Sequence, residues 1–330
     1  MRCAILDDYQ GVSLSMADWS PLAGRVTCEV FREHEDDPVA LAQRLAGFEI
    51  VVVMRERTPL TRAFFEALSG LRLVVTSGMR NAAIDLEAAA AHGVVVCGTA
   101  SSSDPPAELT WALLLALARN LVEEAQALRS DGPWQRSVGT NLRGKTLGLV
   151  GLGKIGSRVA QYARAFEMNV VAWSPHLTQE RASKAGASLA ASLPELMAVS
   201  DFVSLHLVLG PTTRGLVDRA ALAAMKPTAR FVNTSRAGLV DNEALLEALE
   251  HGRIAGAAVD VFDHEPLPLG DRWRTAPRLL ATPHLGYVCE SNYRVYFREA
   301  VEDIEAFLDG KPRRTLLAAP AVSRPLLNFG

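Results

Sequence analysis

The sequence predicts an α/β protein built from two doubly wound parallel-sheet domains. The chain has 330 residues, and at about 150 residues per domain this length suits two domains. Hydrophobic residues make up 49% of the chain and charged residues 22%, which is the balance of an ordinary globular protein and not of a disordered one. Short β-branched runs alternate with helix-like segments along most of the chain, as they do in parallel sheets with crossover helices.

The first series of alternating segments extends from the N-terminus to residue 97. Strands are expected where aliphatic and β-branched residues cluster, over residues 4–6, 26–31, 50–54, 73–76 and 94–97. Helices are expected between them, over residues 38–46, 61–68 and 86–91. Together these segments predict the first parallel sheet.

A polar break rich in serine and proline separates this series from the next. Residues 101–106, Ser-Ser-Ser-Asp-Pro-Pro, interrupt the alternation and open a long apolar helix that continues through Arg119 and beyond. Asp104 is placed to cap this helix, and Pro105 suits its first turn. We therefore expect the chain to cross into a second domain here.

The second series begins at Thr146 and has enough strands for a complete nucleotide-binding sheet. Strands are expected over residues 147–150, 170–173, 202–205, 230–232 and 257–261, with helices over 155–167, 194–199, 219–225 and 242–250. A last helix, over 290–308, follows the end of this sheet and could return to the first domain. The predicted domains are residues 1–103 with 288–330, and residues 104–287.

Charge and composition exclude several classes of partner. The 34 Lys and Arg residues are balanced by 37 Asp and Glu residues, so no broad basic surface is available for nucleic acid. The longest apolar stretch, residues 111–118, is far shorter than the ~20 residues that cross a bilayer, and the N-terminus does not resemble a secretory signal. The four cysteines (Cys3, Cys28, Cys97 and Cys289) include no C-x-x-C pair. We therefore expect reduced thiols, a cytoplasmic location and no metal site.

The sequence G-L-G-K-I-G at residues 151–156 fits the pattern G-x-G-x-x-G, directly after an apolar strand and at the start of an amphipathic helix. In this context the first glycine permits a tight turn, the second lets the backbone approach a pyrophosphate, and the third allows the helix to pack closely on the strand. The phosphates would lie at the N-terminus of the helix. The predicted cofactor contacts here are Gly151, Gly153, Lys154, Ile155 and Gly156.

The end of the following strand is expected to contact the adenosine ribose of the cofactor. Ser174 and Pro175 stand there, where an acidic residue is usual about 20 residues after the glycine-rich turn. The Ser174 hydroxyl can hydrogen-bond a ribose, but it neither repels a 2′-phosphate nor pairs with one, and no arginine follows immediately. NAD and NADP therefore both stay open, with NAD slightly favoured, and His176 is interpreted as a solvated loop residue.

A second phosphate-binding pattern is rejected because its context is wrong. Residues 139–146 match G-x-x-x-x-G-K-[ST], but a loop of that kind must follow a strand and lead into a helix. This segment follows a polar stretch and leads into the strand expected at 147–150. ATP hydrolysis is therefore not predicted.

Three polar side chains follow the later strands of the second series: Arg236, Glu265 and His284. Doubly wound folds bind their ligands at the carboxyl ends of the strands, so these side chains are candidates for a common site. Taken singly, they could be a surface arginine, a loop glutamate and a structural histidine. As one ordered series beyond a glycine-rich turn, they resemble the pattern of a known family.

That family is the D-isomer-specific 2-hydroxyacid dehydrogenases, which include phosphoglycerate dehydrogenases and glyoxylate/hydroxypyruvate reductases. The chain resembles it in Leu-His-Leu at 205–207, Asn-Thr-Ser-Arg at 233–236, Asp-Val-Phe at 260–262 and Thr-Pro-His-Leu-Gly at 282–286. The resemblance covers nearly the whole chain. It implies a Rossmann cofactor domain inserted into a flavodoxin-like substrate domain, and a homodimer built around the helix after Pro106.

The same resemblance implies roles for individual residues. Arg236, Glu265 and His284 would be the catalytic three. Asp260 would approach the nicotinamide carboxamide, and Thr110 would lie near the cofactor phosphates. The other implied cofactor contacts are Leu207, Val208, Thr213, Thr234, Ser235, Arg236, His284 and Gly286.

Reduction of a 2-oxo acid needs these residue types on chemical grounds as well. The planar guanidinium of Arg236 can bind the carboxylate through two hydrogen bonds while it polarises the carbonyl. The carbonyl oxygen gains negative charge as the hydride arrives, and the imidazole of His284 can supply the proton that it then needs. A carboxylate beside the ring, here Glu265, favours the imidazolium form and fixes the orientation of the ring.

The expected substrate loop departs from the family pattern. Residues 76–81, Thr-Ser-Gly-Met-Arg-Asn, replace the usual glycine-rich loop, and Met79 and Arg80 make it bulkier and more cationic. Arg55, after the strand at 50–54, is a second candidate, although surface charge is the alternative for both arginines. The predicted substrate contacts are Arg55, Ser77, Gly78, Met79, Arg80, Arg236 and His284.

These observations predict an NAD- or NADP-dependent oxidoreductase that interconverts a D-2-hydroxy acid and a 2-oxo acid. Reduction of a small 2-oxo acid such as glyoxylate or hydroxypyruvate is favoured, and a phosphoglycerate dehydrogenase-type reaction stays open. A non-catalytic dinucleotide sensor, similar to the transcriptional corepressors of the same family, is the alternative from another class, but the intact catalytic set argues for chemistry. Formate oxidation is disfavoured because Glu265 stands where that branch uses an amide.

Overall fold

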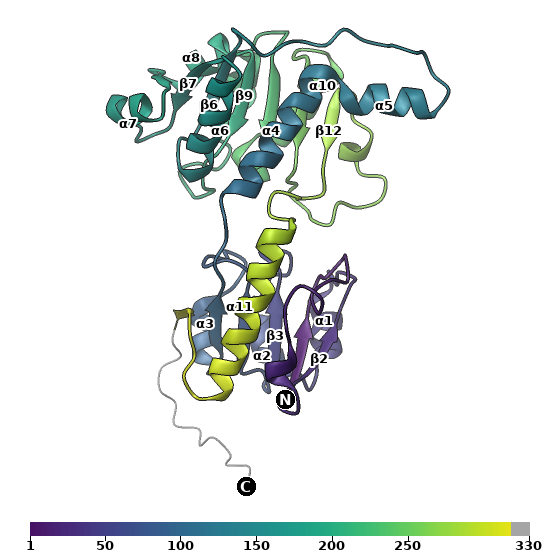
Figure 1. The fold of residues 1–330 in the computed structure, drawn as a ribbon, viewed down its shortest axis with the longest axis vertical. Coiled ribbons are helices and arrows are strands. Elements are labelled where there is room, and N and C mark those ends of the chain that lie inside the picture. Colours follow the sequence, from purple (N-terminus) through teal and green to yellow (C-terminus); the bar gives the residue numbers. More distant parts are fainter. Residues whose placement is uncertain (318–330) are drawn as a thin grey trace. The chain divides into compact units, whose positions relative to one another are not determined.

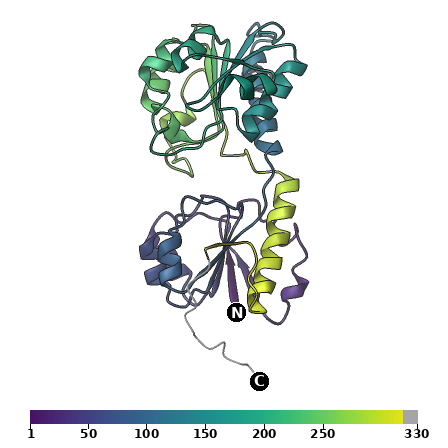
Figure 2. The ribbon, with the colours of Figure 1, turned by 90° about the vertical axis from the view of Figure 1, so that its left-hand side faces the viewer.

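The computed structural model describes residues 1–317, and the chain divides into two compact units (Figures 1 and 2). Unit 1 comprises Met1–Ser102 and the segment that starts at Cys289, and unit 2 comprises Ser103–Val288. Each unit contains a mainly parallel sheet, so the predicted α/β class with two parallel-sheet domains is confirmed. The predicted first domain extends to Gly330, and residues 318–330 lie outside the described residues.

The sheet of unit 1 has the strand order β13-β5-β4-β3-β1-β2. All described neighbours in it are parallel except β13, which runs antiparallel to β5. The order 2-1-3-4-5 within it is the flavodoxin-like order, with its topological switch between β1 and β3. The strands are β1 (Arg2–Ile5), β2 (Thr27–Val30), β3 (Ile50–Val53), β4 (Leu73–Thr76), β5 (Val95–Gly98) and β13 (Thr315–Leu317).

Helices cover both faces of this sheet, which explains why β3 and β4 are buried at every position and are mostly aliphatic. Figure 2 shows the last long helix, α11, on one face and the helices that precede β4 and β5 on the other. On its sheet-facing side α11 buries Tyr296, Phe297 and Ile304. The helices are α1 (Pro38–Arg44), α2 (Arg62–Ala67), α3 (Leu86–Ala91), α11 (Glu290–Leu308) and the 3-10 turn η1 (Ser20–Leu22).

The sheet of unit 2 is wholly parallel, with the order β12-β11-β10-β9-β6-β7-β8. Its direction of winding reverses between β6 and β9, and the crevice at the carboxyl ends of these strands is the usual ligand site of such a sheet. The strands are β6 (Thr146–Val150), β7 (Asn169–Trp173), β8 (Ser188–Leu189), β9 (Phe202–Leu205), β10 (Arg230–Asn233), β11 (Gly256–Val259) and β12 (Leu279–Ala281).

Two helical layers enclose the sheet of unit 2 (Figure 2). On one face α4 packs against α6, and on the other α9 contacts both α8 and α10. The helices are α4 (Asp104–Arg119), α5 (Leu121–Arg129), α6 (Lys154–Ala165), α7 (Gln179–Lys184), α8 (Leu193–Val199), α9 (Arg219–Ala223) and α10 (Asn242–Glu250), with 3-10 turns η2 (Ala237–Leu239) and η3 (Arg272–Arg274). None of the described helices combines the length and the apolar character needed to cross a membrane.

The helix that opens unit 2 differs from its prediction at both ends. Ser103 is the N-cap residue and Asp104 is the first helical residue, where its carboxylate forms an ion pair with Arg158. Pro105 lies in the first turn, as predicted. The helix ends at Arg119 because Asn120 adopts a left-handed backbone conformation with φ 51°, so α4 and α5 are separate helices.

Several short elements were missed at the sequence level. The segment of α7 and β8 is polar and alanine-rich and offers little periodicity, and β12 has three residues only.

Residues 139–145 form neither a helix nor a strand and lead into β6. The predicted context of the second phosphate-binding pattern, which leads into a strand and not into a helix, is therefore confirmed.

Candidate active site at the carboxyl edge of the second sheet

The glycine-rich turn connects β6 to α6 at the switch point of the sheet in unit 2. Gly151 has φ +104°, and a Cβ atom on it would lie 2.5 Å from the carbonyl oxygen of His206. A Cβ atom on Gly156 would lie 2.3 Å from the carbonyl oxygen of Gly151. Both positions therefore require glycine, one for the turn and the other for the close packing of α6.

Gly153 stands out because its surroundings are open. A Cβ atom on it would meet no other atom within 4 Å, so the backbone here is accessible to a ligand. Gly153 is also the N-cap of α6, which begins at Lys154 and continues with Ile155. An accessible turn before a 12-residue helix places backbone N–H groups and the positive end of the helix dipole at one spot, which fits a pyrophosphate.

The expected ribose contacts follow the end of β7. Ser174 is half-buried directly after Trp173, the last residue of this strand, and Pro175 is exposed. Arg181 of α7 folds back onto this loop and donates a hydrogen bond to the His176 carbonyl over 3.4 Å. Sequence reasoning found no arginine near Ser174, since α7 was not predicted.

The loop after β9 carries three further predicted cofactor contacts. The Thr213 hydroxyl donates to the Val208 carbonyl over 2.7 Å and accepts from the Gly210 N–H over 2.9 Å, which closes the loop on itself. The Ser235 hydroxyl donates to the Leu207 carbonyl over 2.6 Å. Val208 is 77% exposed, so this loop presents a side chain to solvent at the carboxyl edge.

His206 lies in the same loop, directly after β9. Exclusion of water lowers the pKa of His206 to about 4, because burial penalises the charged imidazolium. Its Nε2 atom lies 3.0 Å from the Ser204 hydroxyl. His206 is therefore uncharged near neutral pH and is not a second proton donor of this edge.

Arg236 is presented by a turn at the end of β10. The buried Asn233 side chain holds this turn, since its amide donates to the Arg236 carbonyl over 3.1 Å and its oxygen accepts from the Ser235 N–H over 3.0 Å. The guanidinium of Arg236 donates to the Ser235 carbonyl over 2.7 Å. Asn233 is a positioning residue that sequence reasoning did not single out, although it belongs to the matched Asn-Thr-Ser-Arg segment.

Glu265 and His284 form a hydrogen-bonded pair. Oε2 of Glu265 lies 2.6 Å from Nδ1 of His284, and Oε1 of Glu265 accepts from the Phe262 N–H over 2.8 Å. The edge of one ring faces the other where Tyr287 packs on His284, at 5.3 Å between ring centroids. With Nδ1 bound to the carboxylate, Nε2 is the ring atom that can exchange a proton with a ligand.

Asp260 fixes the loop that carries His284. Its carboxylate is fully buried after β11 and accepts from the Thr282 hydroxyl (2.6 Å), the Leu285 N–H (2.7 Å) and the Gly286 N–H (2.9 Å). Burial raises the pKa of Asp260, while these hydrogen bonds and the charge of His284 act in the opposite direction. Asp260, which directly follows β11, thus holds residues on both sides of His284 in position.

Thr110 and Thr234 meet at the same edge from distant parts of the sequence. The Thr110 hydroxyl on α4 donates to the Pro106 carbonyl over 2.8 Å and lies 2.7 Å from the Thr234 hydroxyl. This contact joins α4 to the turn before Arg236.

Among the described residues, no group of three or more His, Cys, Asp or Glu side chains could hold a metal ion.

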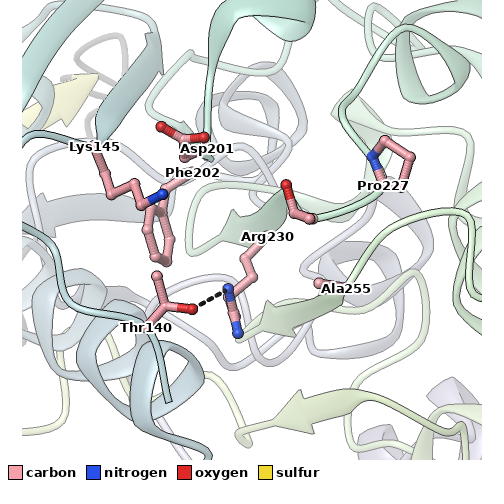
Figure 3. Close-up of a pocket in the computed structure, with 8 residues that line it drawn as sticks. Thr140, Lys145, Asp201, Phe202, Pro227, Arg230 and Ala255 are labelled. Atoms are coloured by element: carbon pink, nitrogen blue, oxygen red, sulfur yellow. Dashed lines mark hydrogen bonds between the residues drawn. The ribbon is translucent and has the colours of Figure 1, made fainter. Parts of the chain in front are cut away.

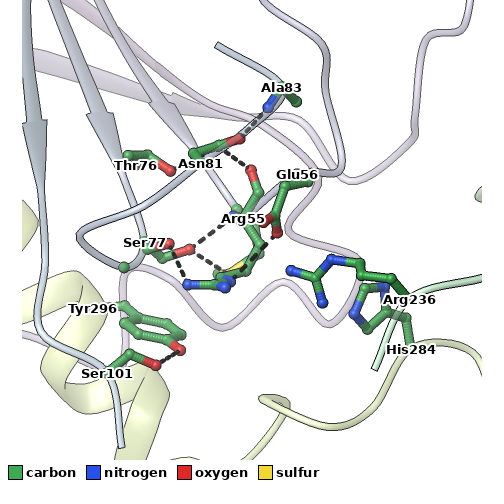
Figure 4. A network of polar contacts seen from close by, with 12 residues as sticks. Arg55, Glu56, Thr76, Ser77, Asn81, Ala83, Ser101, Arg236, His284 and Tyr296 are labelled. Carbon is green, nitrogen blue, oxygen red and sulfur yellow. Dashed lines mark hydrogen bonds and ion pairs between the residues drawn. The ribbon is translucent and has the colours of Figure 1, made fainter. Parts of the chain in front are cut away.

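The predicted substrate residues Arg55 and 77–80 belong to unit 1, where Arg55 and Ser77 form part of a local network (Figure 4). Arg55 has φ 53°, its N–H donates to the Ser77 hydroxyl over 2.9 Å, and its guanidinium donates to the Ser77 carbonyl over 3.2 Å. A Cβ atom on Gly78 would lie 1.9 Å from the Arg55 guanidinium. Gly78 is therefore needed for Arg55 to lie across the loop.

Asn81 anchors the end of this loop and was not singled out from the sequence. Its side-chain amide donates to the Arg55 carbonyl and the Thr76 hydroxyl, and its oxygen accepts from the Ala83 N–H (Figure 4). Met79 and Arg80 are exposed. The loop thus consists of a tightly bonded base with two exposed side chains.

Comparison with known proteins gives consistent matches. Residues 111–286 match the family described as D-isomer specific 2-hydroxyacid dehydrogenase, NAD binding domain. D-3-phosphoglycerate dehydrogenase of Bacillus subtilis is 36% identical over 276 residues, which cover 83% of this chain and 52% of that protein. The corresponding protein of Methanocaldococcus jannaschii is 37% identical over 280 residues, covering 84% and 53%. The chain therefore spans about half the length of these curated relatives.

A solved structure matches nearly end to end. The phosphoglycerate oxidoreductase of Vibrio cholerae O395 superimposes with a TM-score of 0.89 and 38% sequence identity. The superposition covers 94% of this chain and 99% of that chain. Both units of the fold therefore have counterparts in one known protein.

Proposed function

Because this chain belongs to the D-isomer-specific 2-hydroxyacid dehydrogenase family, whose members use NAD or NADP, we propose that it interconverts a D-2-hydroxy acid and a 2-oxo acid. The observation that carries the proposal is the pairing of Glu265 with His284 on the edge that also presents Arg236 and the glycine-rich turn. The direction that we favour is reduction of a small 2-oxo acid. The proposed location is the cytoplasm.

The cofactor would be held along the carboxyl edge of unit 2. The bound nicotinamide supplies the hydride for reduction and accepts it for oxidation. The open backbone at Gly153 and the N-terminus of α6 would bind the pyrophosphate. The other proposed contacts are Gly151, Lys154, Ile155, Gly156, Ser174, Pro175, Leu207, Val208, Thr213, Thr234, Ser235, Arg236, Asp260, His284, Gly286 and Thr110.

Arg236 would bind the substrate carboxylate. Its guanidinium can form two parallel hydrogen bonds with a carboxylate, which orients the neighbouring carbonyl as well as binding the charge. The Asn233-braced turn supports this role, since it limits the movement of the Arg236 backbone. A lysine at this position would keep the charge but lose the two-pronged geometry.

His284 would transfer the proton. In reduction its Nε2–H protonates the carbonyl oxygen as negative charge develops there, and in oxidation the neutral ring removes the hydroxyl proton. Glu265 would stabilise the charged ring and hold it in one orientation through Nδ1. Asp260, by holding the backbone at Leu285 and Gly286, would keep the ring in place.

Unit 1 would contribute to substrate recognition through Arg55, Ser77, Gly78, Met79 and Arg80. The guanidinium of Arg55 lies across the loop at Ser77 and forms an ion pair with Glu56 at 3.6 Å, and it would contribute positive charge for an acidic substrate. The curated relatives named D-3-phosphoglycerate dehydrogenase favour 3-phosphoglycerate as the second candidate substrate. The bulk of the exposed Met79 supports a substrate other than that one.

Initial rates with a panel of acids test the proposal. Purified protein is assayed with NADH and then NADPH against glyoxylate, hydroxypyruvate, pyruvate, phenylpyruvate and 2-oxoglutarate, and in the oxidising direction with 3-phosphoglycerate. Turnover of one of the 2-oxo acids is the expected result. Turnover of 3-phosphoglycerate alone would establish the second candidate, and cofactor binding without any turnover would favour a dinucleotide sensor.

We also propose that the protein is a homodimer built around α4, the helix that contains Pro106, together with the α5 region that follows it. Large apolar side chains are exposed there without forming part of the core of their own unit, including Trp134 at 80% and Val138 at 95% exposure, and also Leu128 on α5. Large apolar side chains that are exposed close together in the sequence can contribute to an interface between subunits. Light scattering after gel filtration should show a dimer that dissociates in the double variant Leu128→Ser, Trp134→Ser, whereas Leu269→Ser, at an exposed leucine elsewhere, should not change the mass.

A further inference from the structure

A cavity of about 320 Å³ lies at the amino edge of the sheet in unit 2 (Figure 3). Lys145 precedes β6, Asp201 precedes β9 and Arg230 is the first residue of β10. Thr140 and Phe202 complete its polar and aromatic wall. Because strands β6, β9 and β10 are parallel, this cavity is at the opposite end of the sheet from the glycine-rich turn and Arg236.

Arg230 is a half-buried cation for which the protein supplies little compensation. Its guanidinium lies over the Phe202 ring, 5.7 Å from the centroid, and makes one long contact of 3.5 Å with the Thr140 hydroxyl. Loss of hydration lowers the pKa of Arg230. Among residues 1–317 no carboxylate lies within 4.0 Å of it. A partly desolvated charge without a counter-charge costs free energy, and an anion in the cavity would offset this cost.

The acidic residue of the cavity is already neutralised. Asp201 accepts from the Lys226 ammonium over 3.0 Å and from the Thr146 N–H over 2.8 Å. The charge of Lys145 contributes to lowering the pKa of Asp201, after the hydrogen bonds from Thr146 and Lys226, but Lys145 forms no ion pair within 4.0 Å among the described residues. Two cations, Lys145 and Arg230, are therefore left to act on the contents of the cavity.

We propose that this cavity binds a small organic anion through a carboxylate or phosphate-monoester group. Arg230 provides the planar donor pair and Lys145 the second positive charge. The volume lies at the lower end of the range for small-molecule sites, about 300–1,000 Å³, and the walls at Phe202 and Ala255 can contact a short carbon chain. The ligand would not compete with the cofactor, since the two sites occupy opposite edges of one sheet.

Calorimetric titration of the full-length protein tests the site. Inorganic phosphate and succinate are titrated separately, with and without saturating NADH, at an ionic strength held constant with chloride. We expect saturable binding of one of them, unaffected by NADH, that weakens about tenfold or more in Arg230→Met, which loses a charge-assisted pair of hydrogen bonds. Lys145→Met should weaken it less, and Arg253→Met, at an exposed arginine of the same unit, should leave it unchanged.

The titrations with phosphate and with succinate distinguish the two possible classes of ligand. Saturable binding of phosphate alone assigns the site to phosphate monoesters, and binding of succinate alone assigns it to carboxylates. No saturable binding of either anion would overturn the proposal, and so would equal affinities in the wild type and Arg230→Met. The readout needs no turnover, so it stands apart from the proposed dehydrogenase reaction.

Thermal unfolding distinguishes a ligand site from a structural arginine. In buffer without multivalent anions, Arg230→Met should unfold at the same temperature as the wild type or higher, because it removes an uncompensated charge. The stabilisation that the bound anion gives the wild type should be absent from the variant. A marked fall in the unfolding temperature of Arg230→Met without any anion would instead show that the guanidinium is a structural contact.

Discussion

The two edges of the sheet in unit 2 are made by the same strands and are built in opposite ways. At the carboxyl edge the carboxylates of Asp260 and Glu265 are matched by hydrogen-bond donors, three for the first and two for the second. At the amino edge Arg230 and Lys145 face a cavity in which the described residues provide no free counter-charge. The first edge is therefore held together by hydrogen bonds within the chain, whereas the second leaves two positive charges that, in our proposal, a bound anion balances.

The largest effect should come from the proton donor of the assembled edge. His284→Gln keeps a hydrogen-bonding side chain but cannot carry the proton, so kcat for reduction should fall by about 10²–10⁴. Because His284 is also a proposed cofactor contact, fluorescence titration with NADH should be used to separate any loss of cofactor affinity from the loss in kcat. His251→Gln, at an exposed histidine after α10, is the matched control and should keep full activity. A change in kcat of less than about twofold in His284→Gln would remove this residue from the proposed chemistry.

Removal of Asp260 should loosen the same edge and destabilise the unit. Asp260→Ala leaves the Thr282 hydroxyl and the N–H groups of Leu285 and Gly286 without their acceptor. Unfolding in urea should become about 4 kcal/mol easier, since each unsatisfied buried group costs about 1–3 kcal/mol. Thr282→Val, which removes one of these donors and leaves the carboxylate, should cost less. Equal stability of Asp260→Ala and the wild type would contradict the positioning role.

His206 should make the stability of this unit sensitive to acid. The free imidazole titrates at 6.5 and the folded one at about 4, so the unfolded chain binds a proton over this interval and the folded one does not. The contribution of His206 is therefore complete above pH 6.5 and declines as the pH falls towards 4, by about 3 kcal/mol in total. Urea midpoints at pH 7 and pH 4.5 should differ less in His206→Gln than in the wild type. Identical pH dependence would disprove this assignment.

A smaller effect is expected at the end of β7. Ser174→Asp places a carboxylate where the ribose of the cofactor is expected, so it should repel the 2′-phosphate of NADPH and accept hydrogen bonds from the ribose of NADH. The ratio of kcat/KM for NADH over NADPH should rise by about tenfold, the change that 1.4 kcal/mol produces. Arg181→Gln should act in the same direction if this arginine serves the phosphate. An unchanged ratio in Ser174→Asp would place the ribose elsewhere.

The smallest effect is expected on stability at the amino edge of the sheet in unit 2. Arg230→Met should change the stability of the ligand-free protein by less than about 0.5 kcal/mol, whereas Asp260→Ala changes it by several. Unfolding curves of Arg230→Met and Asp260→Ala, measured under the same conditions, compare the two losses of stability directly. A large loss in Arg230→Met would mean that both edges are assembled by the chain.

The sequence predicts those parts of the site that depend on local order. The glycine-rich turn is recognisable because strand, turn and helix follow one another directly, and its fold is confirmed. Arg236, Glu265 and His284 were selected because each follows a strand, and the hydrogen bond between Glu265 and His284 is consistent with that placement. Their roles stay predictions.

Features that arise from tertiary contacts could not be predicted from the sequence. Asn233 and Asn81 act through hydrogen bonds that only the folded turns create. Arg230 meets Thr140 across 90 residues of sequence, and a strand-initial arginine has no motif of its own. Arg181 was missed because α7 is short and polar, so that its return to the loop after β7 left no periodic signal.

A double-mutant cycle on Glu265 and His284 tests the central claim, that the carboxyl edge works as an assembled unit, most directly. Values of kcat for 2-oxo acid reduction are compared among the wild type, Glu265→Gln, His284→Gln and the double variant. We predict that the double variant is no slower than His284→Gln, because Glu265 acts only through the ring that it orients. If the two losses multiply, Glu265 acts independently of His284 and the claim is wrong.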